Sequence, residues 1–418
     1  MGELKQNSIS LGNTILGIGL IVLGIFTTYY QSDLLMRIYD VIGFILLFQA
    51  GRMLISYFEH KDKSNLLEVL LFIVAGCIFF FYTDMPVGLT KLVLAGYMVI
   101  FGIIKLIGYY TYKQNKVGGR FIVLSIGLIA VIAGILSIVG NFISIDTMLV
   151  VIGIYTIVLG INYCIDAVDM ILPRNKSDKF KRKIRIDIPI AVAALMPRQM
   201  LEYINNHVQT MDQKEFNDYK NETIMEVFVH VSPDGMGVMG HCDLYFDGEV
   251  LSYGNYDFKS TKLFEILGDG VLFTCKDKQA YIDFAIKESN KTIFGYYLNL
   301  SPEQIESVRA KIKEIKENTY QWYPIGYTDK DFNEDYASRL YHNTQANFYK
   351  FKSGKFKTYF VLGTNCVLLA DSIIGASGSD IVDINGIVAP GTYYDYLEKE
   401  SIRENGLVSK KTIYHKMT

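Results

Sequence analysis

The chain has 418 residues, of which half are hydrophobic, and its net charge is −2. A charge this close to zero gives no basic field of the kind that attracts nucleic acid, so no nucleic-acid partner is expected. The five cysteines are scattered and contain no Cys-x-x-Cys pair, which argues against a disulfide framework and against a zinc site. We therefore expect neither a metal nor a cofactor.

The apolar residues are distributed unevenly along the chain. Residues 11–172 contain long apolar runs, whereas residues 174–418 have the mixed charge of a soluble protein. This contrast predicts a membrane domain (1–173), a basic juxtamembrane linker (174–200) and a soluble domain (201–418).

The membrane domain contains six apolar stretches that are long enough to be transmembrane helices. A hydrocarbon core of about 30 Å needs about 20 helical residues to cross it. The first stretch lacks a small-residue cleavage pattern, so we interpret it as a membrane span and not as a signal peptide. The six stretches lie near residues 11–30, 34–57, 65–82, 87–109, 120–140 and 145–171.

The basic residues between these stretches predict the orientation of the chain. The connectors after the second and fourth stretches carry Lys or Arg, whereas the connectors after the first, third and fifth carry none. The segment from Arg174 to Arg185 is the most basic in the chain. Because positive residues stay on the cytoplasmic side, both termini and the soluble domain are expected in the cytoplasm. The prediction is a multi-pass protein of a bacterial cytoplasmic membrane.

The six stretches read as three copies of one helical hairpin, because a glycine recurs at corresponding places in each. The first helices carry Gly24, Gly76 and Gly134, and the second helices carry Gly43, Gly96 and Gly153. Regular self-similarity of this kind indicates a repeat architecture. Glycine lets membrane helices approach closely, so a packing role is expected. This half resembles the HdeD-like family of six-helix bacterial membrane proteins, some of which are linked to acid resistance.

Several short patterns predict the elements of the soluble domain. Met225–Val231 is rich in β-forming residues, and Asp247-Gly248 separates two further such runs, which predicts a β-hairpin. Ser301-Pro302-Glu303-Gln304 opens a helix with a capping box, and its buried face is predicted from the spacing of the apolar residues Ile305, Val308, Ile312 and Ile315.

Cys366 is the candidate nucleophile, because Asn365-Cys366 begins an apolar segment of helical character. The positive end of a helix dipole lowers the pKa of a thiol, and the thiolate is the reactive form. The backbone N–H of Cys366 could also stabilise an oxyanion. Cys242 is a weaker rival, because it points to the opposite face of its strand from the neighbouring His241. Cys275 lies in a predicted strand and is expected to be structural.

A nucleophilic cysteine needs a base, usually a histidine. His241 follows a glycine at the start of the predicted hairpin and is the best of the six histidines. His230 lies in a plainer strand and is expected to be a packed or surface residue. His342 has no recognisable context.

Three ordered pieces of the soluble half resemble the circularly permuted papain-like proteins. They are Gly240-His241 with Leu251–Tyr256, then Tyr297–Gln304, then Tyr359-Phe360 with Asn365-Cys366. The resemblance extends to NlpC-type cysteine hydrolases, to lecithin:retinol acyltransferase relatives and, more closely, to bacterial lipoprotein N-acyltransferases. It implies an α+β papain-like domain after the all-α six-helix bundle, with Cys366 as nucleophile and His241 as base.

The sequence departs from these relatives in two ways. They often carry a second histidine on the strand after the hairpin, where this chain has Ser252, Tyr253 and Asn255. Asn255 is our prediction for the residue that orients His241, with Ser252 as the next choice. Lipoprotein N-acylation takes place outside the cytoplasmic membrane, whereas the charge pattern places this domain inside.

The function predicted from these features is a membrane-tethered cysteine acyltransferase or hydrolase. It would act through a thioester on a membrane lipid or a lipidated protein. One alternative is a non-enzymatic stress-resistance or transport protein with a degenerate papain-like sensor or binding domain. Another alternative is a cysteine peptidase.

Overall fold

The computed structural model describes residues 2–60, 66–140, 142–171, 224–231, 240–289, 292–377, 390–402 and 406–415. The predicted linker 174–200 lies outside these residues. The chain divides into two compact units. One contains Asn13–Tyr109 and Gly119–Cys164, and the other contains Met1–Gly12, Tyr110–Gly118 and Ile165–Thr418.

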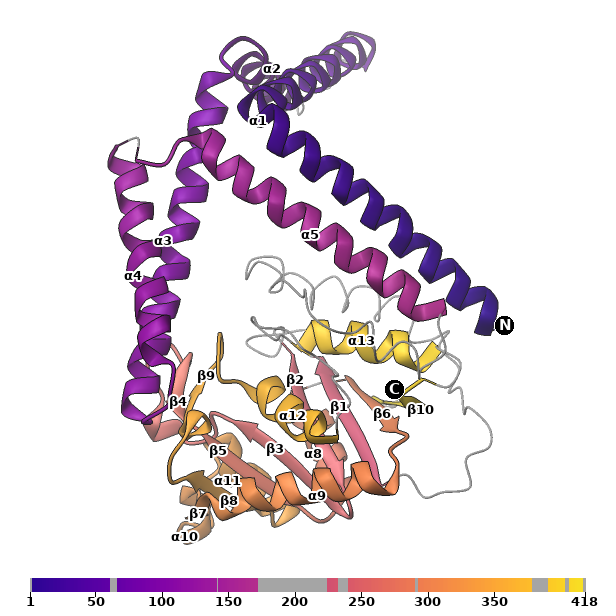
Figure 1. Cartoon of the computed structure of the whole chain (residues 1–418), viewed down its shortest axis with the longest axis vertical. Helices are drawn as coiled ribbons and strands as arrows, with labels where there is room; N and C mark the ends of the chain where they lie inside the picture. The colour runs from indigo at the N-terminus through magenta and orange to yellow at the C-terminus, as the bar shows by residue number, and fades with distance from the viewer. Residues whose placement is uncertain are drawn as a thin grey trace. The chain divides into compact units, whose positions relative to one another are not determined.

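The N-terminal part is formed by long apolar helices, which confirms the predicted membrane character (Figure 1). They are α1 (Gly2–His60), α2 (Leu66–Phe81), α3 (Asp84–Gln114), α4 (Arg120–Val139) and α5 (Ile145–Ile171). Among the described residues, α1, α3, α4 and α5 are long and apolar enough to cross a membrane. The structure therefore shows four such helices where the sequence predicted six.

Two of the predicted spans are joined in one helix, and a third is short. Helix α1 covers both 11–30 and 34–57, but its backbone is not helical at Gln31 (φ 48°, ψ −124°), which divides it into two segments. Helix α2 has only 16 residues, fewer than a straight crossing of the hydrocarbon core requires.

The recurring glycines pack helices against one another, as expected. A Cβ atom built on Gly24 in α1 would lie 2.6 Å from the carbonyl oxygen of Gly153 in α5. After the break at Gln31, α1 packs on α2, where a Cβ atom on Gly43 would lie 3.0 Å from the carbonyl oxygen of Gly76. No side chain larger than hydrogen fits at such contacts unless the helices separate.

The middle repeat corrects one residue of the predicted pattern. A Cβ atom on Gly134 in α4 would lie 2.9 Å from the carbonyl oxygen of Ala95 in α3, whereas one on Gly96 would meet no described atom within 4 Å. The contact position is therefore Ala95. With it, the interval between the paired positions is 19 residues in every repeat (24 to 43, 76 to 95, 134 to 153).

The C-terminal part contains an eight-stranded antiparallel sheet in the order β10-β6-β1-β2-β3-β5-β8-β7. A separate two-stranded sheet pairs β4 with β9. The strands are β1 (Met225–Val231), β2 (His241–Phe246), β3 (Glu249–Gly254), β4 (Leu267–Asp269), β5 (Val271–Cys275), β6 (Thr292–Leu298), β7 (Thr319–Trp322), β8 (Asn347–Phe351), β9 (Thr358–Phe360) and β10 (Val408–Tyr414).

Helices cover both faces of the large sheet and give the domain three layers (Figure 1). One face packs against α9 (Pro302–Glu317), α12 (Cys366–Ile374) and α13 (Pro390–Ile402). The other packs against α8 (Lys278–Ser289) and α11 (Tyr336–Thr344). The remaining short helices are η4 (Phe258–Ser260), α10 (Ile325–Thr328), η5 (Lys355–Lys357) and η6 (Gly375–Ser377). This arrangement confirms a sheet-rich domain, while the permuted papain-like topology stays a prediction.

The local predictions agree with the structure. Asp247 and Gly248 join β2 to β3, and both have positive φ (50° and 86°), as the twist of a tight hairpin turn requires. The Ser301–Gln304 capping box is formed at the start of α9. Helix α12 begins at Cys366, with Asn365 as its N-cap.

Candidate functional site

Cys366 is the first residue of α12, and its position is fixed by the residue before it. The side-chain oxygen of Asn365 accepts a hydrogen bond from the backbone N–H of Leu368 (3.1 Å), and its amide donates to the carbonyl of Val361 (3.1 Å). The Cys366 side chain is buried, and its electrostatic interaction with His241 and Tyr359 places it beside both side chains. The backbone N–H of a first helical residue has no partner within its own helix, so it remains available to a bound group.

His241 is the first residue of β2 and brings three further polar groups to the thiol. Its Nε2 atom lies 2.8 Å from Asp243 Oδ1, 3.0 Å from Ser252 Oγ and 3.0 Å from the Tyr256 hydroxyl. Since His241 also interacts electrostatically with Cys366, the structure brings a thiol, an imidazole and a carboxylate close together.

Asp243 is the residue that the sequence reasoning missed. Its carboxylate is buried and lies 2.8 Å from His230 Nε2 through Oδ2, in addition to its contact with His241. Tyr281 of α8 donates a third bond to it. A signal was present, because residues two apart on a strand point to the same face, and His241 and Asp243 stand in that relation on β2.

The charges at this site lower the pKa of Asp243 and raise the pKa of His241. Burial alone would raise the pKa of Asp243, but the positive charges of His241 and His230 lower it well below its usual range. Burial likewise opposes the charged form of His241, but the negative charges of Asp243 and Cys366 outweigh it and raise the pKa of His241 to about 10. The arrangement therefore favours a protonated His241 ring beside the ionised carboxylate of Asp243 at neutral pH.

A raised pKa makes the contribution of His241 to stability depend on pH. The free imidazole titrates near 6.5, so the contribution is complete below about pH 6.5 and is lost as the pH rises through about 10. The difference in Tm between the wild-type chain and His241→Gln, measured in detergent, should therefore shrink between these limits. Asn343→Gln is the control, because an amide side chain does not titrate in this range. An equal loss in both variants would contradict this assignment.

The other residues that the sequence singled out do not all lie where they were predicted. Asn255 donates to the carbonyl of Glu265 (3.3 Å) and lies against Gly268, whereas the second choice, Ser252, contacts the His241 ring. His230 is buried and packed, as expected, but against Asp243. Cys242 faces the core beneath α12, where burial raises the pKa of its thiol well above the usual value.

A cavity of about 490 Å³ opens beside His241. Its lining includes Tyr256 and Tyr336, whose rings stack 5.6 Å apart, and the aromatic side chain of Tyr359. Asp335 and Arg339 add polar groups to the lining. Glu265 and Glu334 also line it, so the cavity combines aromatic and charged side chains beside His241. A concave site in which polar groups converge is a usual setting for a substrate.

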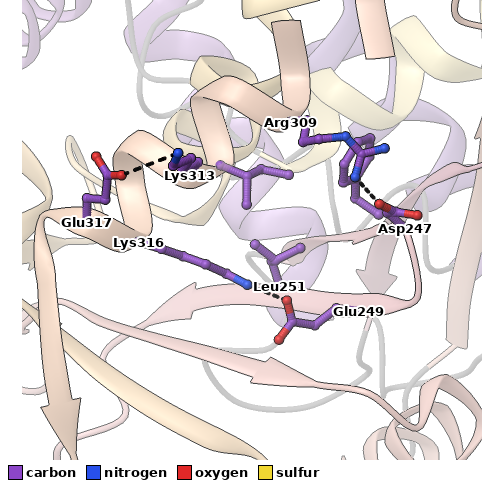
Figure 2. Close-up of a pocket in the computed structure, with 9 residues that line it drawn as sticks. Asp247, Glu249, Leu251, Arg309, Lys313, Lys316 and Glu317 are labelled. Carbon is purple, nitrogen blue, oxygen red and sulfur yellow. Dashed lines mark hydrogen bonds and ion pairs between the residues drawn. The ribbon is translucent and has the colours of Figure 1, made fainter. Parts of the chain in front are cut away.

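A second cavity, of about 520 Å³, lies between α9 and the β2–β3 hairpin (Figure 2). Its charged side chains neutralise each other, as in Arg309 with Asp247 and Lys316 with Glu249. His241 lines the first cavity, whereas no histidine is among the residues that line the second. Within the described part of the chain, no group of three His, Cys, Asp or Glu side chains is arranged to hold a metal. We therefore assign the candidate site to the cavity beside His241.

A family model matches part of the N-terminal region. Residues 15–81 and 67–139 match the family described as "Short repeat of unknown function (DUF308)". Comparisons with curated proteins and with solved structures gave no match. The N-terminal region is therefore similar to the membrane-associated short repeats found in HdeD-like proteins.

Proposed function

We propose that the chain is a membrane-tethered cysteine acyltransferase or hydrolase that forms a thioester on Cys366. The observation that carries this proposal is the set Cys366, His241 and Asp243, in which the His241 ring interacts electrostatically with Cys366 and lies 2.8 Å from a buried carboxylate. This is the arrangement of an activated nucleophile, a base and a group that orients the base. Asp243 takes the orienting role for which the sequence favoured Asn255.

In the first step, the Cys366 thiolate attacks the carbonyl carbon of an acyl donor. The C–S bond forms while the negative charge moves to the carbonyl oxygen, which the backbone N–H at the start of α12 can stabilise. The bond to the leaving group then breaks, and the leaving group takes the proton of His241. The products are the thioester and a neutral imidazole.

In the second step, an alcohol, amine or water attacks the thioester and gives its proton to His241. Part of the raised pKa of His241 comes from the negative charge of Cys366. That charge is absent from the thioester, so the pKa of the ring falls while the acyl group is attached. The neutral ring is therefore a base when the second step needs one, and release of the thiolate restores the starting pair.

Tethering favours a lipid or a lipidated protein as the substrate. The apolar part of α1, Ser10–Tyr57, has 48 residues, about twice what one crossing requires, and the backbone break at Gln31 lies within it. With α2 as a short span, six crossings follow.

The basic segment 174–185 supports a cytoplasmic location for the soluble domain. The resemblance to lipoprotein acyltransferases supports the opposite side, so the experiment below also measures the side.

The test is the rate at which iodoacetamide alkylates each cysteine of the full chain, measured by peptide mass spectrometry. Both side chains are buried, but Cys366 should react far faster at neutral pH than Cys275, which is bonded to the backbone carbonyls of Asp277 and Thr344 and whose pKa burial raises. His241→Ala should slow the reaction of Cys366 by about 10²-fold or more and leave the rate at Cys275 unchanged. A charged, membrane-impermeant methanethiosulfonate should block Cys366 in inverted vesicles and not in right-side-out ones.

Equal rates at Cys366 and Cys275 would contradict the proposal and favour a non-enzymatic binding domain. Blocking in right-side-out vesicles would leave the chemistry intact and reverse the orientation. The reaction product then distinguishes acyl transfer from peptidase activity, because only a transferase leaves the acyl group attached to a new acceptor. The comparison is between membranes that contain the wild-type chain and membranes that contain Cys366→Ala.

A further inference from the structure

The loop of residues 258–266, which joins β3 to β4 and is called the apolar loop below, exposes three large apolar side chains. The exposed fractions are 59% for Phe258, 53% for Leu263 and 96% for Phe264. A single exposed apolar residue is ordinary, but a group of them in one short segment marks a site of interaction.

The backbone at the tip of the apolar loop adds to this observation. Leu263, Phe264 and Glu265 have φ values of 52°, 55° and 67°, in the left-handed region that residues with a side chain rarely adopt. Two backbone bonds between Lys262 and Leu267 (2.8 and 3.2 Å) close the loop beneath them. Strain and exposure both disfavour a phenylalanine at position 264, and such a combination points to a functional constraint.

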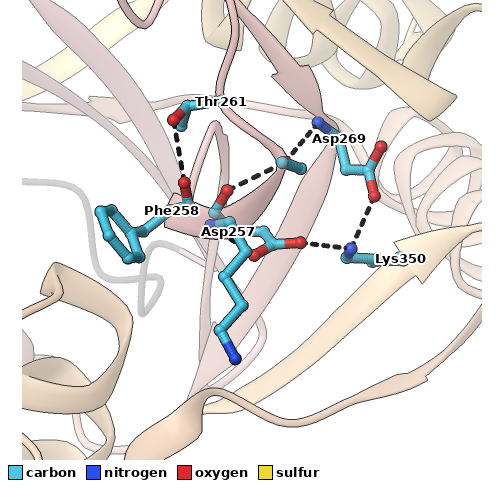
Figure 3. Close-up of polar contacts among 7 residues, drawn as sticks. Asp257, Phe258, Thr261, Asp269 and Lys350 are labelled. Atoms are coloured by element: carbon cyan, nitrogen blue, oxygen red, sulfur yellow. Dashed lines mark hydrogen bonds and ion pairs between the residues drawn. The ribbon is translucent and has the colours of Figure 1, made fainter.

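The base of the apolar loop is clamped to the large sheet (Figure 3). Lys350 of β8 lies 2.6 Å from the carboxylate of Asp257 and 2.6 Å from that of Asp269, one on each side of the loop. The Ser260 hydroxyl accepts a further bond from the backbone N–H of Asp269 (2.9 Å). The loop therefore projects from a fixed base.

The same clamp determines the charge that the apolar loop presents. Lys350 pairs with both Asp257 and Asp269, which leaves one net negative charge at the base of the loop, whereas Lys259 and Lys262 are exposed beside the apolar side chains. Glu265 is the acidic residue of the loop. Apolar side chains next to lysines are the chemistry of a segment that binds the interface of an anionic bilayer.

Two facts indicate a bilayer as the partner. The chain carries long apolar helices, so the domain is held near a membrane at high effective concentration. Phe258, Thr261 and Glu265 of the apolar loop also line the cavity beside His241. A bilayer in contact with the loop would therefore border the cavity.

We infer that the apolar loop inserts into the surface of an anionic bilayer, with Phe264 in the acyl region and Lys259 and Lys262 at the headgroups. The insertion brings acyl chains of membrane lipids to the mouth of the cavity. This last step rests on the proposed function, whereas the insertion does not depend on the chemistry of Cys366.

The test uses the full chain in nanodiscs made with or without phosphatidylglycerol and with or without brominated acyl chains. The native chain has one tryptophan, Trp322, so Phe264→Trp adds one reporter at the tip of the loop. The emission of this tryptophan should shift to the blue in nanodiscs, and brominated acyl chains should quench it. Both changes should be larger when the nanodiscs contain phosphatidylglycerol. Tyr320→Trp, on β7 and 50% exposed, is the control and should show neither change.

Adding Lys259→Gln and Lys262→Gln to the Phe264→Trp chain should weaken the insertion equilibrium by about fivefold for each lysine. Emission from Phe264→Trp that matches the water-exposed control would overturn the inference. So would a blue shift without quenching by bromine, because that result means contact with protein. A Cys366→Ala background should leave the quenching unchanged, so a failure of docking is distinguishable from a failure of the acyl chemistry.

Discussion

Asp243→Asn should slow the alkylation of Cys366 at neutral pH by about 10²-fold or more and lower the pKa of His241. The carboxylate is buried, and its charge balances the rings of both His241 and His230. Asparagine keeps the size of the side chain but removes the charge, so the protonated ring beside the thiol is no longer favoured. Asp243→Ala should in addition cost about 3–5 kcal/mol of folding stability, because it leaves buried rings without their partner.

The pH profile of alkylation separates a role in positioning His241 from a merely structural one. In the Asp243→Asn chain, the part of the profile that reports His241 should move to lower pH, whereas simple loosening of the fold would lower the rate at every pH. Asp247→Asn is the matched control from the turn of the same hairpin, where the side chain is half-exposed and asparagine tolerates the positive φ of 50°. An unchanged rate and profile in Asp243→Asn would remove Asp243 from the site.

Gly24→Ala should destabilise the helical unit by about 1–3 kcal/mol, the usual effect of overpacking. The added Cβ atom would lie 2.6 Å from the carbonyl oxygen of Gly153, which belongs to the backbone and cannot turn aside. Helix α1 must then move away from α5. The measurement is the midpoint of unfolding when sodium dodecyl sulfate is titrated into the chain in mild detergent.

Gly96→Ala is the control for this experiment, and its expected effect has the opposite sign. No described atom lies within 4 Å of a Cβ atom at position 96. Alanine forms helix better than glycine by about 1 kcal/mol, so this variant should be neutral or more stable. Equal destabilisation by Gly24→Ala and Gly96→Ala would mean that the contact with Gly153 is not the cause.

Local patterns predicted the elements of this protein better than they predicted its long-range contacts. The capping box at Ser301, the turn at Asp247-Gly248 and the helix start at Cys366 each depend on a few neighbouring residues, and each is present. The sequence does not distinguish a break within one helix at Gln31 from a loop between two helices, because either one interrupts the apolar run in the same way.

The candidate site shows the same limit. Cys366 and His241 were selected by their local contexts, but the choice of the orienting residue needed the register of three strands. The sequence reasoning favoured Asn255, beyond the end of β3, whereas the two-residue spacing of His241 and Asp243 on β2 was the more direct signal. His230 reaches the same carboxylate because the register of β1 against β2 pairs it with His241.

The pairing of the repeat positions has a consequence for how the helical unit is built. The segment of α1 after Gln31 contacts α2, α3 contacts α4, and α5 contacts the segment of α1 before Gln31. With the helices grouped into the three hairpins that the sequence predicts, each hairpin contacts the next and the third contacts the first. Three separate, identical hairpins in a cyclic trimer would make the same contacts. The helical unit has the interfaces of three subunits joined in one chain, so each repeat depends on its neighbours to cover its glycine surfaces.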